Sequence, residues 1–286
     1  MANPICLSPL KFYDSIKKQE RHKNYAYGHI SPIVMPFNVI QPFQFVIPNW
    51  MTIQSVYLRD INDNRVTGNI IQRLNEAGLA RIQIENYSVI TYSGIYPILD
   101  VKYEGQYYLE LVTNISWYTY YSEIFCFTNS TDRYIEIEYW NPEGDFSING
   151  GVITFANNFR FKLLINSELG KPEYSFEEES TSRLGYNYVE SQVSKKVYKF
   201  NAVLPEYICD AMRLIRLCSN KRITCNGDTY EALSFEMDVD WQEQGDLASV
   251  NCEFEVDNII ANFGGFRHTK AGGDFNNDYN NDFKTK

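Results

Sequence analysis

The chain has 286 residues, of which 44% are hydrophobic and 22% charged, so it is long enough for two domains and apolar enough to build real cores. Aromatic residues make up 15%, which favours half-buried pleated surfaces and therefore β structure. The formal net charge of -10 argues against direct binding to nucleic acid or to an anionic membrane, because both need an excess of Lys and Arg.

The N-terminal 30 residues predict an extended arm. The stretch 16–24, IKKQERHKN, is charged and has no apolar face, which is typical of a solvated segment or one that orders on a partner. The apolar run 4–10 is too short for a signal peptide and follows no basic residues. No window approaches the roughly 20 apolar residues of a membrane helix. We therefore expect synthesis in a cytoplasm and no membrane partner.

Residues 31–167 predict one or two β-sandwich-like modules. Four prolines between residues 32 and 48 forbid a continuous helix there. Strand signals separated by turn residues then recur, and the alternation in YIEIEYW places Ile135, Ile137 and Tyr139 on one face. Strands at such regular spacing are typical of a sandwich or a barrel.

Residues 168–185 predict a linker, because they are polar, carry an acidic run and include glycine and proline. Residues 186–262 predict an α+β oligomerisation module. Its helix is expected over 205–220, where apolar residues recur three and four apart. Residues 263–286 are rich in Gly and Asn and predict an extended C-terminal tail.

The stretch SFEMDVDWQEQGDLASVNCEFEVDN, residues 234–258, predicts a β-hairpin. It alternates apolar and polar residues, breaks at 242–246 and alternates again. Trp241 begins the polar loop, where a large aromatic side chain can anchor an interface. Arg213 and Arg216 lie off the apolar stripe of the helix, where they can reach a partner or remain locally paired. The candidate interface residues are Trp241, Gln242, Glu243, Gln244, Asp246, Arg213 and Arg216.

The chain shows no catalytic, cofactor or metal motif, so we expect no enzyme activity and no cofactor. The six Cys are scattered at spacings that fit no usual zinc site, and we expect buried free thiols. Two alternatives stay open. The aromatic residues Trp117, Tyr120 and Trp140 could stack on a glycan. Glu136, Glu138 and Glu143 near Trp140 could serve a glycoside hydrolase, although the solvent face of a sheet is the commoner role for such residues.

Four stretches carry a resemblance: LSPLKFYDSIKKQ, GKPEYSFEEEST, LPEYICDAMRLIRLC and WQEQGDLASVNCEFEVDN. They resemble tail-region structural proteins of Bacteroidales phages and prophages, over about the first 50 residues and residues 170–260. The resemblance implies a mainly β virion protein without catalysis that joins copies of itself and other tail proteins, through sheet edges and terminal arms, in a ring or tail tip. A carbohydrate- or receptor-binding module of the virion, with a host glycan as partner, is the alternative.

Overall fold

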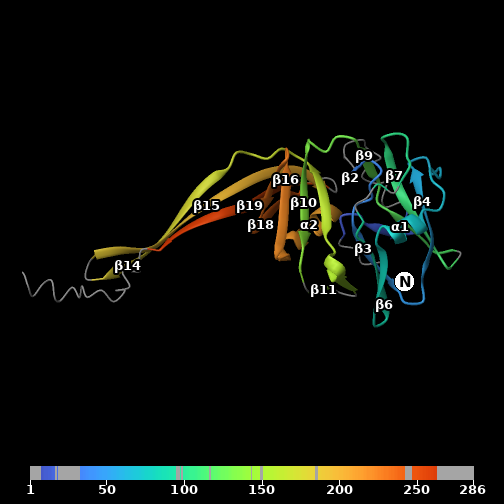
Figure 1. Cartoon of the computed structure of the whole chain (residues 1–286), viewed down its shortest axis with the longest axis horizontal. Helices are drawn as coiled ribbons and strands as arrows, with labels where there is room; N and C mark the ends of the chain where they lie inside the picture. The colour runs from blue at the N-terminus through green and yellow to red at the C-terminus, as the bar shows by residue number, and fades with distance from the viewer. Residues whose placement is uncertain are drawn as a thin grey trace, which may run out of the picture.

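The computed structural model describes residues 8–16, 18, 33–94, 97, 99–115, 117–142, 144–148, 151–183, 186–241 and 247–262. Figure 1 shows an elongated molecule with a body at one end and a long β-ribbon projecting from it. Several antiparallel sheets form the body, which confirms the predicted mainly β class. No helix in the described part of the chain has the length and apolarity to cross a membrane.

Two sheets of the N-terminal half pack against each other. One contains β1 (Phe12–Asp14), β8 (Thr119–Ser122), β7 (Gln106–Thr113), β9 (Phe125–Thr128), β2 (Ile33–Pro36) and, on β7, β4 (Ile53–Asp60). The other contains β3 (Phe43–Pro48), β6 (Tyr87–Tyr92) and β5 (Leu79–Ile84), and α1 (Ile71–Glu76) precedes β5. Phe45 bridges the two sheets, because its ring lies 4.5 Å from that of Phe12 and 5.7 Å from that of Tyr120. This is the sandwich-like packing that the alternating pattern predicted.

A third sheet joins the two halves of the chain. It contains β13 (Phe161–Asn166), β10 (Tyr134–Trp140), β16 (Asn220–Cys225) and β17 (Asp228–Glu231). A hairpin of β11 (Asp145–Ile148) and β12 (Gly151–Thr154), followed by a short 3-10 helix (Ala156–Asn158), leads from β10 to β13. Because β10 and β16 pair directly, the predicted N-terminal and C-terminal modules share one sheet.

The C-terminal sheet contains the longest strands of the fold. Its strands, in order, are β14 (Glu173–Arg183), β15 (Tyr186–Pro205), β19 (Leu247–Asn262) and β18 (Ser234–Trp241). The pairing of β18 with β19 confirms the predicted hairpin. The helix α2 (Glu206–Leu217) packs on this sheet, as predicted, and its apolar stripe is buried. Asn226 and Gly227 form the tight turn between β16 and β17 with positive φ, which Asn and Gly tolerate best.

The structure corrects two sequence-based expectations. The expected linker 168–185 contains the strand β14, because alternating residues there pair along the whole length of a longer neighbouring strand. The expected N-terminal arm contributes β1, whose Phe12 is buried in the core. Residues 119–128 pair with one edge of β7 in two segments, β8 and β9, because the pairing is interrupted at Glu123 and Ile124.

Candidate assembly interface

The ribbon is the part of the C-terminal sheet that extends beyond β18. It comprises residues 174–183 of β14, 186–196 of β15 and 257–262 of β19, and Figure 1 shows it pointing away from the body. The edge strand β18 ends its pairing at Ser234 with Glu255, so it does not reach the ribbon. No described residue forms a second layer over these three strands, so large side chains on their faces remain exposed.

One side of the ribbon, called the aromatic face, carries large exposed apolar side chains. Residues directly opposite each other on paired strands share a face, which defines this one by three rows. Tyr174, Phe176 and Ile259 on it are 62%, 78% and 69% exposed. The rows are Tyr174–Lys196–Asp257, Phe176–Ser194–Ile259 and Glu178–Gln192–Ala261.

The other side, called the ionic face, is held by charged and polar contacts. Lys195 Nζ lies 2.6 Å from Glu177 Oε1, and Ser191 Oγ lies 3.3 Å from Glu179 Oε2. Ile260 is its main apolar residue and is 58% exposed, beside Val193. Among the side chains that the structure describes, the exposed apolar surface is therefore concentrated on the aromatic face, where neighbouring large apolar side chains mark an interaction surface more strongly than isolated ones.

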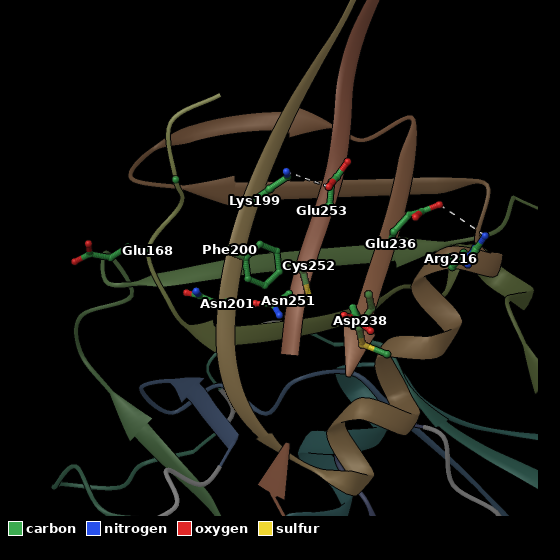
Figure 2. Close-up of a pocket in the computed structure, with 12 residues that line it drawn as sticks. Glu168, Lys199, Phe200, Asn201, Arg216, Glu236, Asp238, Asn251, Cys252 and Glu253 are labelled. Carbon is green, nitrogen blue, oxygen red and sulfur yellow. Dashed lines mark ion pairs between the residues drawn. The ribbon is translucent and has the colours of Figure 1, made fainter. Parts of the chain in front are cut away.

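An open groove of about 540 Å³ lies where the ribbon joins the body. Figure 2 shows it over the polar face of β15, β19 and β18, bordered by the chain at Glu168. Two ion pairs cross it: Lys199 Nζ lies 3.5 Å from Glu253 Oε2, and Arg216 Nη2 lies 3.7 Å from Glu236 Oε1.

The chemistry of this groove is limited. Glu236 and Glu253 are neighbours on one sheet face rather than carboxylates placed across a cleft, and each is paired with a cation. Its thiol, Cys252, is buried, and burial raises the pKa of that thiol to about 12, so it stays protonated at neutral pH. Burial likewise raises the pKa of Cys218 to about 12. The described residues contain no cluster of three or more potential metal-binding side chains of the His, Cys, Asp or Glu type.

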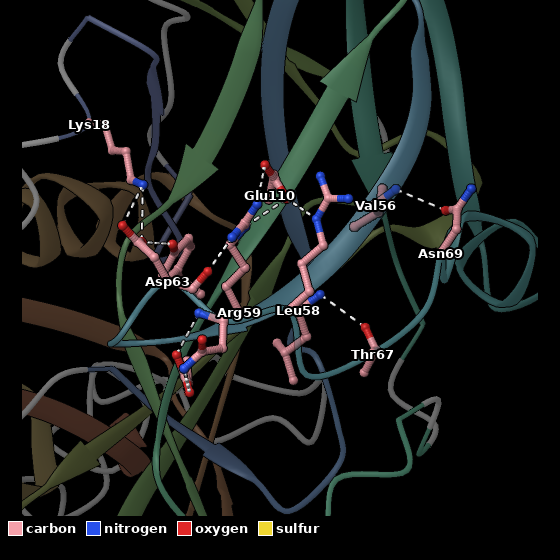
Figure 3. Close-up of polar contacts among 12 residues, drawn as sticks. Lys18, Val56, Leu58, Arg59, Asp63, Thr67, Asn69 and Glu110 are labelled. Carbon is pink, nitrogen blue, oxygen red and sulfur yellow. Dashed lines mark hydrogen bonds and ion pairs between the residues drawn. The ribbon is translucent and has the colours of Figure 1, made fainter.

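The outer edge of β4, in contrast to the ribbon, is covered by the loop that follows it (Figure 3). Asn69 Oδ1 accepts a hydrogen bond of 3.0 Å from the Val56 amide, and Thr67 Oγ1 accepts one of 3.1 Å from the Leu58 amide. The Val56 and Leu58 carbonyls accept hydrogen bonds from the amides of the same loop, at Ile70 and Val66. The loop therefore completes the ladder in place of a further strand.

A buried ion cluster fixes this loop to the sheet. Glu110 Oε2 lies 2.7 Å from Arg59 Nε and 3.0 Å from Arg65 Nε, and the Glu110 side chain is 7% exposed. Burial raises the pKa of Glu110, but the hydrogen bonds from the two arginines outweigh burial, so the pKa lies below its ordinary value. Lys18 and Tyr108 both contact Asp63 at the turn, and Figure 3 shows the cluster.

The described residues among the predicted interface residues, Trp241, Arg213 and Arg216, lie away from the ribbon. Trp241 is 48% exposed at the end of β18 nearest the body, opposite Ala248. Gln242, Glu243, Gln244 and Asp246 lie outside the described residues. Arg213 forms an exposed ion pair with Asp210 at 3.5 Å, and Arg216 borders the groove.

The three predicted glycan-stacking residues do not form one platform. Trp117 is 77% exposed in the turn between β7 and β8, but Tyr120 is only 2% exposed in the core. The ring of Trp140 is covered by the Arg160 guanidinium, 4.1 Å from its centroid, and Arg222 lies nearby at 5.6 Å. A sugar would have to displace these cations to stack on Trp140.

The two described carboxylates considered for glycoside hydrolysis are paired with cations on or next to the neighbouring strands β13 and β16. Glu136 Oε1 lies 2.7 Å from Lys162 Nζ, and Glu138 Oε2 lies 3.3 Å from both Arg160 Nη1 and Arg222 Nη1. Glu143 lies outside the described residues. Glu136 and Glu138 therefore belong to an ion-paired sheet face.

The ribbon was not predicted from the sequence. Two signals could have indicated it: the alternation of Tyr174 and Phe176 with polar residues, and the two residues Leu184 and Gly185 between strand-forming runs, which are typical of a hairpin connection. The acidic run at 177–179 concealed them, because such composition is commoner in loops.

The fold and this surface define a mainly β protein with a projecting three-stranded ribbon. Comparison of the chain with protein-family models, with curated proteins and with solved structures found no match.

Proposed function

We propose that this chain is a non-enzymatic structural subunit of a virion, in a phage tail, tail hub or connecting ring, and that its ribbon joins it to neighbouring subunits. The observation that carries the proposal is the exposure of Tyr174, Phe176 and Ile259 on a three-stranded ribbon that has no covering layer among the described residues. A partner supplies that layer, and burying each such side chain contributes about 1.5–3 kcal/mol.

Several further features support an assembly role. Lys199 and Arg216 in the groove form ion pairs with Glu253 and Glu236, and Glu136 and Glu138 of the third sheet are also ion-paired, so these carboxylates are already neutralised by cations of the same chain. The resemblance of four stretches to phage tail-region proteins supports a virion as the setting of this assembly. Copies of the chain and other tail proteins are then its partners.

Electron cryomicroscopy of particles that contain the chain tests this proposal. We expect repeated copies in a ring or tube, with each ribbon packed on a neighbouring subunit. A single copy with a freely projecting ribbon, or a soluble protein that never enters particles, would contradict it. A glycan array run on the same protein separates the alternative, since saturable binding of one sugar without assembly would favour a receptor-binding module.

A further inference from the structure

The aromatic face of the ribbon is complementary to itself. Its central row places the small Ser194 between Phe176 and Ile259, so two large apolar side chains flank a shallow position. When two copies of this row are stacked face to face with Ser194 opposite Ser194, Phe176 can contact its equivalent on one side of the centre and Ile259 its equivalent on the other.

The rows on either side of the centre differ in charge. Lys196 is central in the row nearer the body, and Glu178 lies in the row nearer the tip, where Gln192 Nε2 donates a hydrogen bond of 2.9 Å to its Oε2. Consider a two-fold axis at Ser194 that runs between the two sheets, parallel to both sheets and perpendicular to the strands. This axis places Lys196 of one copy over Gln192 of the other copy and beside its Glu178. An axis parallel to the strands would instead place Lys196 over its own equivalent, which is unfavourable.

We propose that the ribbon packs through its aromatic face on the ribbon of a second copy of this chain, with strands antiparallel across a two-fold axis at Ser194. This inference rests on the proposed function and names the ribbon's partner. The two ribbons form a small sandwich with sheets about 10 Å apart.

The edge of β14 is a weaker contact site than the aromatic face. It carries three consecutive carboxylates, Glu177 to Glu179, and charged side chains on an edge strand disfavour pairing with another strand. The Glu177 carboxylate is already paired with Lys195 on the ionic face. Hydrophobic contact is therefore available mainly through the aromatic face.

The size of the face sets the strength of the contact. Three strands of about seven residues offer about 350 Å² per copy, less than half of what a stable interface buries. The contact is therefore weak between free chains and becomes effective where a ring holds many copies at high local concentration.

Sedimentation equilibrium of the full chain, at concentrations up to about 300 µM, tests the inference. We expect reversible dimers, and Ile259→Glu should weaken dimerisation at least about tenfold because each dimer buries two copies of the side chain. Ile260→Glu is the matched control: it is the next residue of the same strand, is similarly exposed, lies on the ionic face, and should change dimerisation less than about threefold.

A charge swap tests the orientation. Lys196→Glu and Glu178→Lys should each weaken dimerisation several-fold, because each places like charges together in the dimer. The chain that carries both substitutions should recover dimerisation to about that of the unaltered chain. The two residues lie in different rows of one ribbon, so the recovery reports contact between copies.

Three outcomes would overturn the inference. These are equal effects of Ile259→Glu and Ile260→Glu, no recovery in the charge-swapped chain, and a chain that stays monomeric throughout. If the chain stays monomeric but occurs in particle rings with its ribbon on a different protein, the proposed function stands and only the identity of the partner is wrong. If it also never enters particles, both fail.

Discussion

The two edge strands β4 and β14 differ in whether the rest of the chain covers them. The edge of β4 is completed by its own loop through Asn69 and Thr67, and the loop is fixed by the buried Glu110 cluster. The edge and the aromatic face of the ribbon at β14 have no such cover among the described residues. Within the described residues, the chain therefore covers the edge of β4 and leaves the aromatic face of the ribbon exposed, and this contrast is what the proposed assembly role requires.

The largest effect on stability is expected from Glu110→Ala. The substitution removes the buried carboxylate shared by Arg59 and Arg65, whose side chains are 19% and 46% exposed, and it should lower the free energy of unfolding by about 2–3 kcal/mol. The matched control is Glu178→Ala in the ribbon, which should change it by less than about 0.5 kcal/mol. Urea unfolding of both variants measures the difference, and similar losses would contradict the contrast between body and ribbon.

The contribution of Glu110 should depend on pH with a definite sign. The folded-state pKa of Glu110 is below its ordinary value, so the contribution is fully present above the unfolded pKa of about 4.3. It is lost as the pH falls through the lower folded value. The stability difference between the unaltered chain and Glu110→Ala should therefore shrink below about pH 4, and a constant difference across that range would contradict the assignment.

A smaller effect is expected from Asn69→Ala. The side chain of Asn69 accepts hydrogen bonds from the amides of Val56 and Ile71, and its loss should cost about 1–2 kcal/mol. The exposed edge of β4 should also make the protein aggregate faster on heating. Asn69→Asp keeps an acceptor oxygen and should retain most of the stability. Thermal unfolding with light scattering compares the three chains, and equal losses for both variants would show that the acceptor is unimportant.

The smallest effect on stability is expected from Phe176→Glu. The side chain is 78% exposed, so the free energy of unfolding should change by less than about 0.5 kcal/mol while self-association weakens. Calorimetry at low protein concentration measures the first quantity, and sedimentation at high concentration the second. A large loss of stability in the monomer would mean that this residue packs within its own chain.

Hydrogen exchange provides a comparison without any substitution. The amides of Val56 and Leu58 should be protected in the monomer, because they donate hydrogen bonds to the covering loop. The ribbon strands lack a covering layer, so the β14 amides should exchange much faster, and they should slow on assembly. Equal protection of the β4 and β14 amides from exchange in the monomer would contradict the proposed difference between the covered edge and the uncovered ribbon.

Several elements followed from local sequence alone. The strand at 134–140 was predicted from alternation, and Ile135, Ile137 and Tyr139 are buried as expected. The helix α2 was predicted from its apolar stripe, and the turn at Asn226 from its backbone preference. These predictions succeeded because short-range periodicity and turn chemistry depend on neighbouring residues.

The candidate interface was harder to predict because exposure is a tertiary property. Tyr120 and Phe176 are both aromatic residues that alternate with polar ones in strand-forming stretches, yet the first is 2% exposed and the second 78%. The difference depends on whether another sheet packs over the strand. The sequence around Trp140 likewise gave no indication that Arg160, which directly precedes β13, would cover its ring.

The sequence by itself determined the mainly β class, the C-terminal hairpin and the helix on its sheet, because each is encoded in the period of its apolar residues. Only the tertiary structure decided that β14 joins β15 in a ribbon beyond the reach of β18, and that the β4 edge is closed by a loop. Both depend on which strands lie side by side and where each one ends. Those relations are set by packing between distant parts of the chain, which local periodicity does not record.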